Sequence, residues 1–363
     1  MKEKQLYILA GVFVVLLLVY FVTKPHIETV NIDEIVQTVV FGVSKDAVAD
    51  VEVYKETGGK EIRMEFTKQE DNQWRTPTTF NAKVREYNMN RLLDDVLEMT
   101  GKVATDDPKH QEMFEITDNM GIHLLLKDQA EKPLVNLIIG KRGEDFNSGF
   151  VRFGDKEKVY RVDKNILSAL GVNGSLDTLS HFNTKSFIDL NAIKEDKAKL
   201  HLAGLVKNRK EMVIQKVEKE AAPVVENDTT QAAPKAKEYE WVLLKGEKQT
   251  PLDQKEVENF LRDVTSIYTQ EVVDGVGASL NDMGKPAKYG VDRASNALVL
   301  EKSENNERVT VLFGKEFEKD KGYYMYVQND GLIYKVAKSK YDTIFKWFDE
   351  LPTKLPKPDE KKK

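Results

Sequence analysis

The sequence has no cysteine among its 363 residues. This absence excludes thiolate catalysis, Fe–S clusters, cysteine-based zinc sites, disulfides and lipid modification of an N-terminal cysteine. A chain without cysteine suits an oxidising compartment, because it cannot form a wrong disulfide there. An excess of positive charge is also absent, since 55 Lys and Arg stand against 60 Asp and Glu. We therefore expect no nucleic-acid partner, because such binding needs a basic field.

Sequence patterns that support catalysis or metal binding are missing as well. No Gly-x-Ser-x-Gly nucleophile elbow occurs. No two histidines have the i, i+3 or i, i+4 spacing of a helical metal pair. The histidines are His26, His110, His123, His181 and His201. We expect no catalytic residue, metal site, cofactor or small-molecule substrate, and we interpret the chain as non-enzymatic.

Two short motifs have both a functional and a plain structural interpretation. The segment Gly140-Lys141-Arg142-Gly143 is a basic, glycine-flanked turn, but it lacks the spacing of a P-loop. A hairpin turn is the favoured interpretation there. His110 follows Asp106-Asp107-Pro108, which could form a carboxylate–imidazole cluster. A solvated turn with a helix N-cap is favoured at that position.

Only one apolar run is long enough to cross a bilayer. Residues 6–23 read LYILAGVFVVLLLVYFVT, 18 residues without a charge. As a helix this run would be about 27 Å long, close to the thickness of the bilayer core. A cleaved signal peptide usually has a shorter apolar region that ends in small residues, whereas this run ends in bulky ones. The sequence predicts an uncleaved transmembrane anchor.

The charges on either side of residues 6–23 predict its orientation. Lys2 and Lys4 precede it, whereas Lys24 is followed by acidic residues. By the positive-inside rule, a stub of residues 1–5 lies in the cytoplasm. A linker at 24–37 and the bulk of the chain then lie outside. The prediction is a single-pass protein of the inner (cytoplasmic) membrane, with a periplasmic or other extracytoplasmic bulk.

Beyond the linker, the chain contains an internal repeat. Leu124 to Leu126 recur 174 positions later at Leu298 to Leu300, and the Gly-Lys pair at Gly140 recurs at the same offset. Trp74 recurs at Trp241, 167 positions later. We expect two copies, followed by a disordered Lys-rich tail. The predicted bounds are 38–183 for the first copy, 184–352 for the second, 221–237 for an insertion within it, and 353–363 for the tail.

Each copy shows the same order of predicted elements. A hairpin comes first, at 49–54 with 62–66 and again at 199–205 with 211–217. A strand ending at the tryptophan follows, and then an amphipathic helix, predicted over 84–99 and over 254–267. Three more strands and a helical segment complete each copy, the last helix covering 339–351. The predicted fold class is α+β: a transmembrane helix followed by two tandem repeats of a mostly antiparallel sheet with one or two helices each.

These motifs together resemble one known family, the bacterial domain of unknown function 4340. The matching residues are Trp74 and Pro77, the helix at 91–96, the Tyr-Gly-Val-Asp motif at 289–292 with a weaker copy at 114–118, and the Ile-Gly-Lys and Val-Tyr-Arg-Val blocks. The first copy departs from the motif, with Glu115 in place of the glycine. The resemblance implies a membrane-anchored protein associated with ABC-transporter components of the gliding-motility type, without enzymatic activity.

Two functions remain open from the sequence. The first is a non-enzymatic accessory or scaffold protein that contacts the membrane and other transporter subunits. The second is a periplasmic module that binds a ligand or polymer in the cleft between the repeats. Tyr323, Tyr324 and Tyr326 are either sheet-packing residues or an exposed partner-binding patch. An apolar cleft lined by Tyr324 or Tyr326 would favour the second function.

Overall fold

The structure is a computed structural model that describes residues 36–219, 238–278 and 284–356. The predicted anchor at 6–23, the insertion at 221–237 and most of the predicted tail lie outside these residues. Among the residues that are described, no helix is long and apolar enough to cross a membrane.

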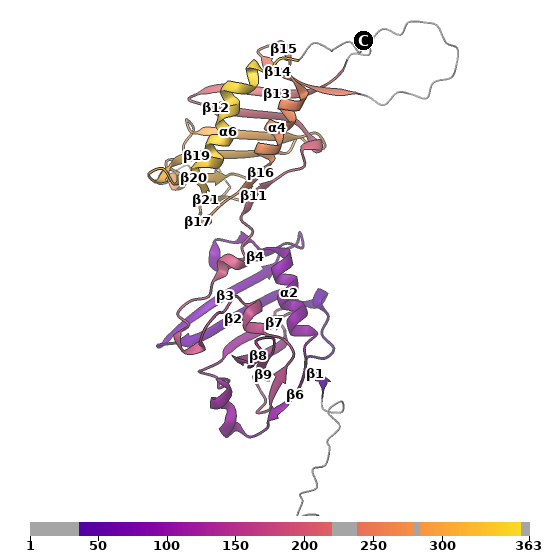
Figure 1. The fold of residues 1–363 in the computed structure, drawn as a ribbon, viewed down its shortest axis with the longest axis vertical. Coiled ribbons are helices and arrows are strands. Elements are labelled where there is room, and N and C mark those ends of the chain that lie inside the picture. Colours follow the sequence, from indigo (N-terminus) through magenta and orange to yellow (C-terminus); the bar gives the residue numbers. More distant parts are fainter. Residues whose placement is uncertain (1–35, 220–237, 279–283, 357–363) are drawn as a thin grey trace, which may run out of the picture.

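Two antiparallel sheets form the body of the protein and lie end to end along its long axis (Figure 1). The first sheet contains β1 (Gln37–Thr38), β2 (Asp50–Thr57), β3 (Lys60–Lys68), β4 (Trp74–Thr76), β5 (Ala82–Lys83), β6 (Thr100–Thr105), β7 (Ile122–Lys127), β8 (Pro133–Arg142), β9 (Gly149–Phe153) and β10 (Val159–Val162). The second contains β12 (Leu200–Lys207), β13 (Lys210–Glu218), β14 (Tyr239–Lys245), β15 (Lys248–Pro251), β17 (Glu271–Gly275), β18 (Asn296–Lys302), β19 (Arg308–Glu318), β20 (Gly322–Val327) and β21 (Leu332–Ala337).

The two sheets have the same strand order. The first runs β6-β10-β9-β8-β7-β2-β3-β4-β5, with β1 added at the β6 edge. The second runs β17-β21-β20-β19-β18-β12-β13-β14-β15. Apart from β1, each strand of the first sheet has a counterpart at the same place in the second, as expected from a duplicated sequence. The α+β class with mostly antiparallel sheets is confirmed.

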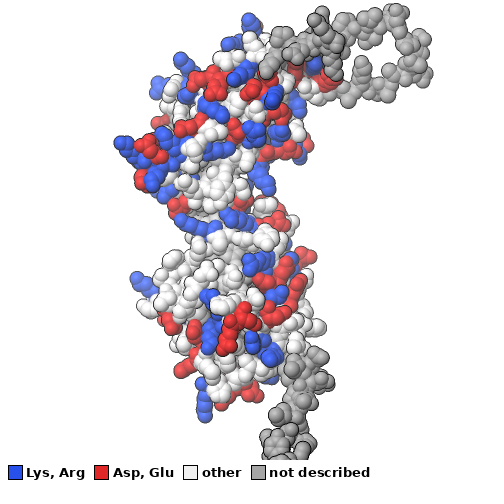
Figure 2. Space-filling model, in the orientation of Figure 1, with Lys and Arg blue, Asp and Glu red and all other residues white. Residues whose placement is uncertain are grey.

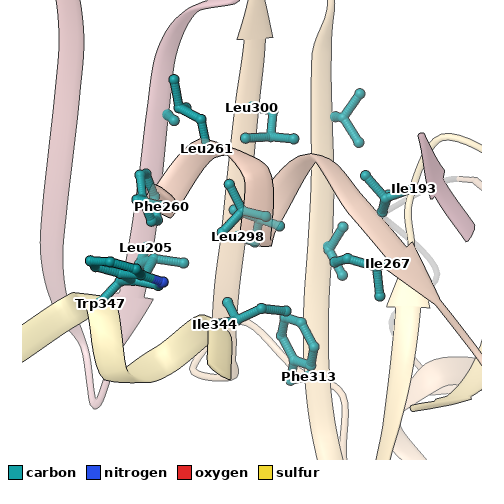
Figure 3. Close-up of a cluster of buried hydrophobic side chains, with 14 of the residues drawn as sticks. Ile193, Leu205, Phe260, Leu261, Ile267, Leu298, Leu300, Phe313, Ile344 and Trp347 are labelled. Atoms are coloured by element: carbon teal, nitrogen blue, oxygen red, sulfur yellow. The ribbon is translucent and has the colours of Figure 1, made fainter. Parts of the chain in front are cut away.

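An amphipathic helix covers one face of each sheet. The helices are α2 (Glu86–Leu97) and α3 (Ile166–Ala169) on the first sheet, and α4 (Gln254–Thr265) and α6 (Lys338–Glu350) on the second. Helix α2 buries Leu92 and Leu93, and α4 buries Phe260 and Leu261 at the corresponding turns. In Figure 3, Phe260 and Leu261 meet Leu298, Leu300 and Trp347 in the second core. These contacts place the core between helices and sheet, where apolar burial stabilises both.

Two details of the element prediction were wrong. After the long helix, the first copy has five strands and the second has six, rather than three. Among them, β6 and β17 are short and show weak apolar alternation, which hides them in the sequence. The last helix of the first copy, α3, has only four residues, whereas α6 in the second has 13. A two-stranded sheet of β11 (Asn191–Lys194) and β16 (Ser266–Tyr268) was also not predicted.

The N-terminus of α4 is capped by a side chain. Asp253 accepts hydrogen bonds from the backbone N–H groups of Lys255 and Glu256, at 2.9 and 3.4 Å. Asp253→Ala is expected to lower the free energy of unfolding by about 1 kcal/mol, because those amides then lose their partner. Urea unfolding followed by circular dichroism measures this change. Lys255 is an exposed residue of the same helical turn, so Lys255→Ala is the control; an equal loss in the two variants would contradict the capping role.

The two cores meet at a short junction. Phe187 belongs to the first core, with its ring 4.8 Å from that of Phe66. The next residue, Ile188, belongs to the second core. Ala82 in β5 of the first sheet is also part of the second core. The chain therefore passes from one core to the other between Phe187 and Ile188, and β5 contacts both units.

Candidate functional site

A cleft of about 690 Å³ lies at this junction. Both repeats contribute to its walls. The lining is mostly polar and charged, and consists of Gln69, Glu70, Asp71, Arg75, Asn81, Lys83, Ala192, Ile193, Glu195, Lys302, Glu307, Val309, Val327, Asn329 and Asp330. Clefts of this volume are common small-molecule sites. Neither Tyr324 nor Tyr326 lines this cleft, so it is not the apolar, tyrosine-lined cleft that would favour a binding module.

Backbone hydrogen bonds hold the two walls of the cleft together. Val84 forms a bridge with Ile188. The N–H of Asp189 donates to the carbonyl of Lys83 at 2.8 Å, and the N–H of Arg85 donates to Phe187 at 2.6 Å. The segment that leaves β5 thus pairs with the segment that enters the second repeat, which fixes the position of Lys83 at the cleft.

Asp330 is a carboxyl group of the cleft whose pKa is raised by burial. Its Oδ2 accepts a hydrogen bond from the Tyr334 hydroxyl at 2.7 Å, and its Oδ1 accepts one from the N–H of Leu332 at 3.0 Å. Burial raises the pKa of Asp330, against the opposing effect of these bonds and of Lys83 and Arg75. Burial and the neighbouring Asp330 also raise the pKa of Tyr334, which therefore stays a protonated donor.

Asp330→Asn is expected to make the protein more stable than wild type near neutral pH. Because the folded-state pKa of Asp330 lies above its unfolded value, stability falls as pH rises through the window between the two. Asparagine removes this cost: its Oδ1 keeps the bond from the Leu332 N–H, and its NH2 donates to the Tyr334 hydroxyl, which rotates to accept. The difference in urea midpoint should vanish at acidic pH, where both side chains are neutral. A variant less stable than wild type at neutral pH would show that Lys83 and Arg75 outweigh burial.

The other charged groups of the cleft are largely paired. Lys302 bridges Glu195 at 3.1 Å and Glu307 at 3.2 Å. Arg75 pairs with Asp71 at 3.5 Å, and its buried Nε has no hydrogen-bond partner. Among the described residues, no three metal-ligating side chains come together. This arrangement can hold a polar ligand, but it shows no activated nucleophile or base.

Tyr323, Tyr324 and Tyr326, which the sequence allows to be either sheet-packing residues or an exposed patch, do not form one exposed surface. Tyr326 is fully buried, and its hydroxyl donates to the Gly277 carbonyl at 2.7 Å. Tyr324 is half-buried against Tyr289, and Tyr323 stacks on Tyr341 of α6 at 4.0 Å on the opposite face of the sheet. Tyr326 therefore cannot contact a partner. The cause is that Val276 and Val291 pack on this part of the sheet and cover it.

The two copies of the Tyr-Gly-Val-Asp motif adopt the same backbone. Gly290 has φ of 72°, and Glu115, which replaces the glycine in the first copy, has φ of 53°. The next residues, Val291 and Ile116, are both fully buried. The motif is thus a left-handed turn that inserts one apolar side chain under the sheet. Glu115 can substitute for glycine there at a cost in backbone strain.

The Ile-Gly-Lys glycines pack directly on this turn. A Cβ on Gly140 would lie 2.3 Å from the carbonyl oxygen of Phe114, and one on Gly314 would lie 2.3 Å from that of Tyr289. The N–H of Lys315 donates to the same Tyr289 oxygen at 3.0 Å. We call this contact the motif latch. The Tyr-Gly-Val-Asp and Ile-Gly-Lys motifs are therefore kept at a fixed spacing because they pack on each other, and not because they form a reactive site.

Sequence reasoning missed Arg152, which completes the latch in the first copy. Its side chain is buried and bonds to the carbonyl of Ile116, to Asp118 and to three carbonyls that follow it in the chain. In the second copy Asp274 has a comparable role, since it accepts from the Tyr289 hydroxyl and pairs with Lys288, both at 2.6 Å. An arginine at an alternating strand position gives no sign of such burial.

The remaining candidate motifs have structural roles. Asp107 caps the short helix Pro108–Phe114 by accepting from the N–H of Lys109, and His110 contacts Thr105. The turn interpretation is therefore confirmed there. The visible face of the molecule intersperses both signs of charge over both repeats (Figure 2). No strongly basic field appears on that face.

The fold and these contacts define a tandem-repeat α+β protein whose motif residues serve packing. The model of the family described as Domain of unknown function (DUF4340) matches residues 74–279 and again 241–358. These matches cover most of the chain, which therefore belongs to this family. They begin at Trp74 and Trp241, the two equivalent tryptophans. No curated protein and no solved structure matches the chain.

Proposed function

We propose that this chain is a non-enzymatic, membrane-anchored scaffold protein that is auxiliary to a transporter-type complex of the inner membrane. The observation that carries the proposal is the motif latch. In both repeats the family motifs are used to pack a turn beneath a sheet, with Ile116 and Val291 fully buried. Residues used this way maintain a shape and leave no reactive group for a substrate.

The arrangement of the repeats supports a scaffold role. The two sheets lie end to end (Figure 1), and paired backbone at Val84 and Ile188 joins them. An elongated body with a hydrogen-bonded junction can hold a partner at a fixed distance from its attachment point. The uncharged run at 6–23 supplies a candidate attachment to the membrane. The family resemblance supports a transporter subunit as the partner.

Membrane fractionation tests the anchor directly. The full chain is expected to sediment with membranes and to resist alkaline extraction, whereas a chain starting at residue 36 is expected to stay in the soluble fraction.

Purification of the full chain in mild detergent tests the transporter partner, and it is expected to recover an ATPase or permease subunit. A soluble full chain, or its purification without any such subunit after crosslinking in cells, would contradict the proposal.

The cleft favours a second candidate function, a binding module for a polar ligand. Its volume of about 690 Å³ suits a small molecule, and its walls offer Lys83 and Asp330 from different repeats. Thermal unfolding with millimolar amino acids, amines and oligosaccharides tests this function. A stabilising shift that Lys83→Ala abolishes would support it. The absence of a shift with all three ligand classes would count against it.

A further inference from the structure

The outer face of the second sheet, opposite α4 and α6, has an apolar row across five strands. Backbone pairing aligns Leu244 of β14, Val213 of β13, Gly204 of β12, Val299 of β18 and Thr310 of β19. The three larger apolar side chains of this row are half-buried. They belong to none of the hydrophobic clusters of the described residues. This apolar row therefore contributes nothing to either core.

The equivalent row of the first sheet is charged. Val299 corresponds to Leu125, and the strand pairing places Glu52 where the second sheet has Gly204 and Glu65 where it has Val213. Arg63 pairs with both glutamates, at 3.3 and 3.0 Å, and Lys127 pairs with Glu52. The duplicated fold thus tolerates a solvated charge network at these positions. The apolar row is a property of the second repeat and not a requirement of the fold.

Gly204 leaves a hollow at the centre of the apolar row. The groove has a volume of about 230 Å³, and Leu202, Val206, Val213 and Val299 line it. A Cβ on Gly204 would meet no atom closer than 3.4 Å, and its φ is not in the left-handed region. The chain's own packing therefore does not demand glycine here. A glycine inside a strand weakens it, and such a residue often marks the approach of another backbone or side chain.

Two opposite charges lie diagonally across this hollow. Glu211 of β13 pairs with Val206 of β12. On the other side of β12, Leu202 pairs with Glu301 of β18, which in turn pairs with Arg308 of β19. Glu211 forms no ion pair with any described residue, whereas Arg308 pairs with Glu301 at 2.7 Å. Consider a second copy related by a two-fold axis that lies parallel to this face and perpendicular to the line from Glu211 to Arg308. Glu211 of each copy then faces Arg308 of the other. A self-complementary patch of this kind is what an isologous contact requires.

We propose that the outer face of the second sheet is the contact surface between two copies of this chain. The copies pack sheet on sheet. The apolar row meets its counterpart, apolar side chains enter the hollow at Gly204, and Glu211 and Arg308 pair at the rim. The charge network on the first sheet keeps the equivalent face solvated and directs the contact to one repeat. This inference goes beyond the proposed function and does not rest on it.

The oligomeric state of the full chain in mild detergent tests the proposal, measured by light scattering at micromolar concentration. Wild type is expected to be a dimer. Val299→Lys is expected to give a monomer, and the matched Leu125→Lys in the first sheet is expected to stay dimeric. Circular dichroism confirms that each variant is folded. A monomeric wild type, or a dimer that survives Val299→Lys because another segment forms the contact, would overturn the proposal.

A charge exchange tests the predicted orientation. Glu211→Arg and Arg308→Glu are each expected to weaken dimerisation roughly tenfold or more, because like charges then face each other. The double variant is expected to restore dimerisation, since each pair is rebuilt with its signs reversed. If the double variant is as weak as the worse single variant, the two-fold arrangement is wrong.

Discussion

Replacing Gly140 or Gly314 with alanine is expected to lower the free energy of unfolding by roughly 3 kcal/mol. The new Cβ would lie 2.3 Å from a backbone carbonyl oxygen in either repeat. A backbone atom cannot rotate away as a side chain can, and in the second repeat the N–H of Lys315 holds that oxygen in place. Strand and turn must therefore separate. Equilibrium urea unfolding measures the loss, which should be similar at the two positions.

Gly204→Ala, unfolded at a protein concentration at which wild type is monomeric, is the matched control for these two variants. Gly204 also lies within a strand, but its Cβ would have ordinary contacts at 3.4 Å. This variant is expected to stay within about 1 kcal/mol of wild type, in the stabilising direction, because alanine reduces the entropy of the unfolded chain. A Gly140→Ala variant as stable as Gly204→Ala would contradict the motif latch.

Arg152→Met is expected to cost about 3–5 kcal/mol of stability. The guanidinium is buried and bonds to the Ile116 carbonyl at 2.8 Å, to three further carbonyls and to Asp118. Methionine has a similar volume but leaves those acceptors without a donor. The single ammonium group of a lysine cannot bond to all of these acceptors, so Arg152→Lys should recover only a small part of the lost stability. Thermal and urea unfolding measure both variants.

The second repeat provides the comparison for Arg152. Tyr326 has the equivalent place in β20 and donates a single hydrogen bond, to the Gly277 carbonyl at 2.7 Å. Tyr326→Phe is expected to cost only about 1 kcal/mol, because one neutral bond is lost and the ring stays packed. A loss for Arg152→Met no larger than that for Tyr326→Phe would mean that the buried guanidinium is not a main support of the first repeat.

The repeat, the hairpins and the long helices could be predicted because they leave regular patterns. The constant offset between Leu124 and Leu298 reflects the shared strand order, and the apolar stripe of Phe260 and Leu261 reflects the helix that covers the sheet. These patterns are local or strictly periodic. They depend little on tertiary contacts with other segments of the chain.

The cleft and the burial of the tyrosines could not be predicted, because they depend on contacts between residues far apart in the sequence. Lys83 and Asp330 are far apart in the sequence, and only the junction brings them together. Alternation predicts which face of β20 Tyr326 lies on, but not that Val276 and Val291, from earlier in the chain, cover that face. Arg152 looks like a solvated strand residue until the turn at Ile116 surrounds it. Contacts of this kind are determined by tertiary packing alone.

We propose that the uncharged run at 6–23 anchors the chain in the membrane, with both repeats outside the cytoplasm. The chain has no cysteine, so single cysteines can be labelled without background. Phe41 is 90% exposed, and Lys2 precedes the apolar run. A membrane-impermeant maleimide applied to intact spheroplasts is predicted to label Phe41→Cys, and Lys2→Cys only after lysis. Labelling of Lys2→Cys before lysis, or protection of Phe41→Cys until lysis, would contradict the account.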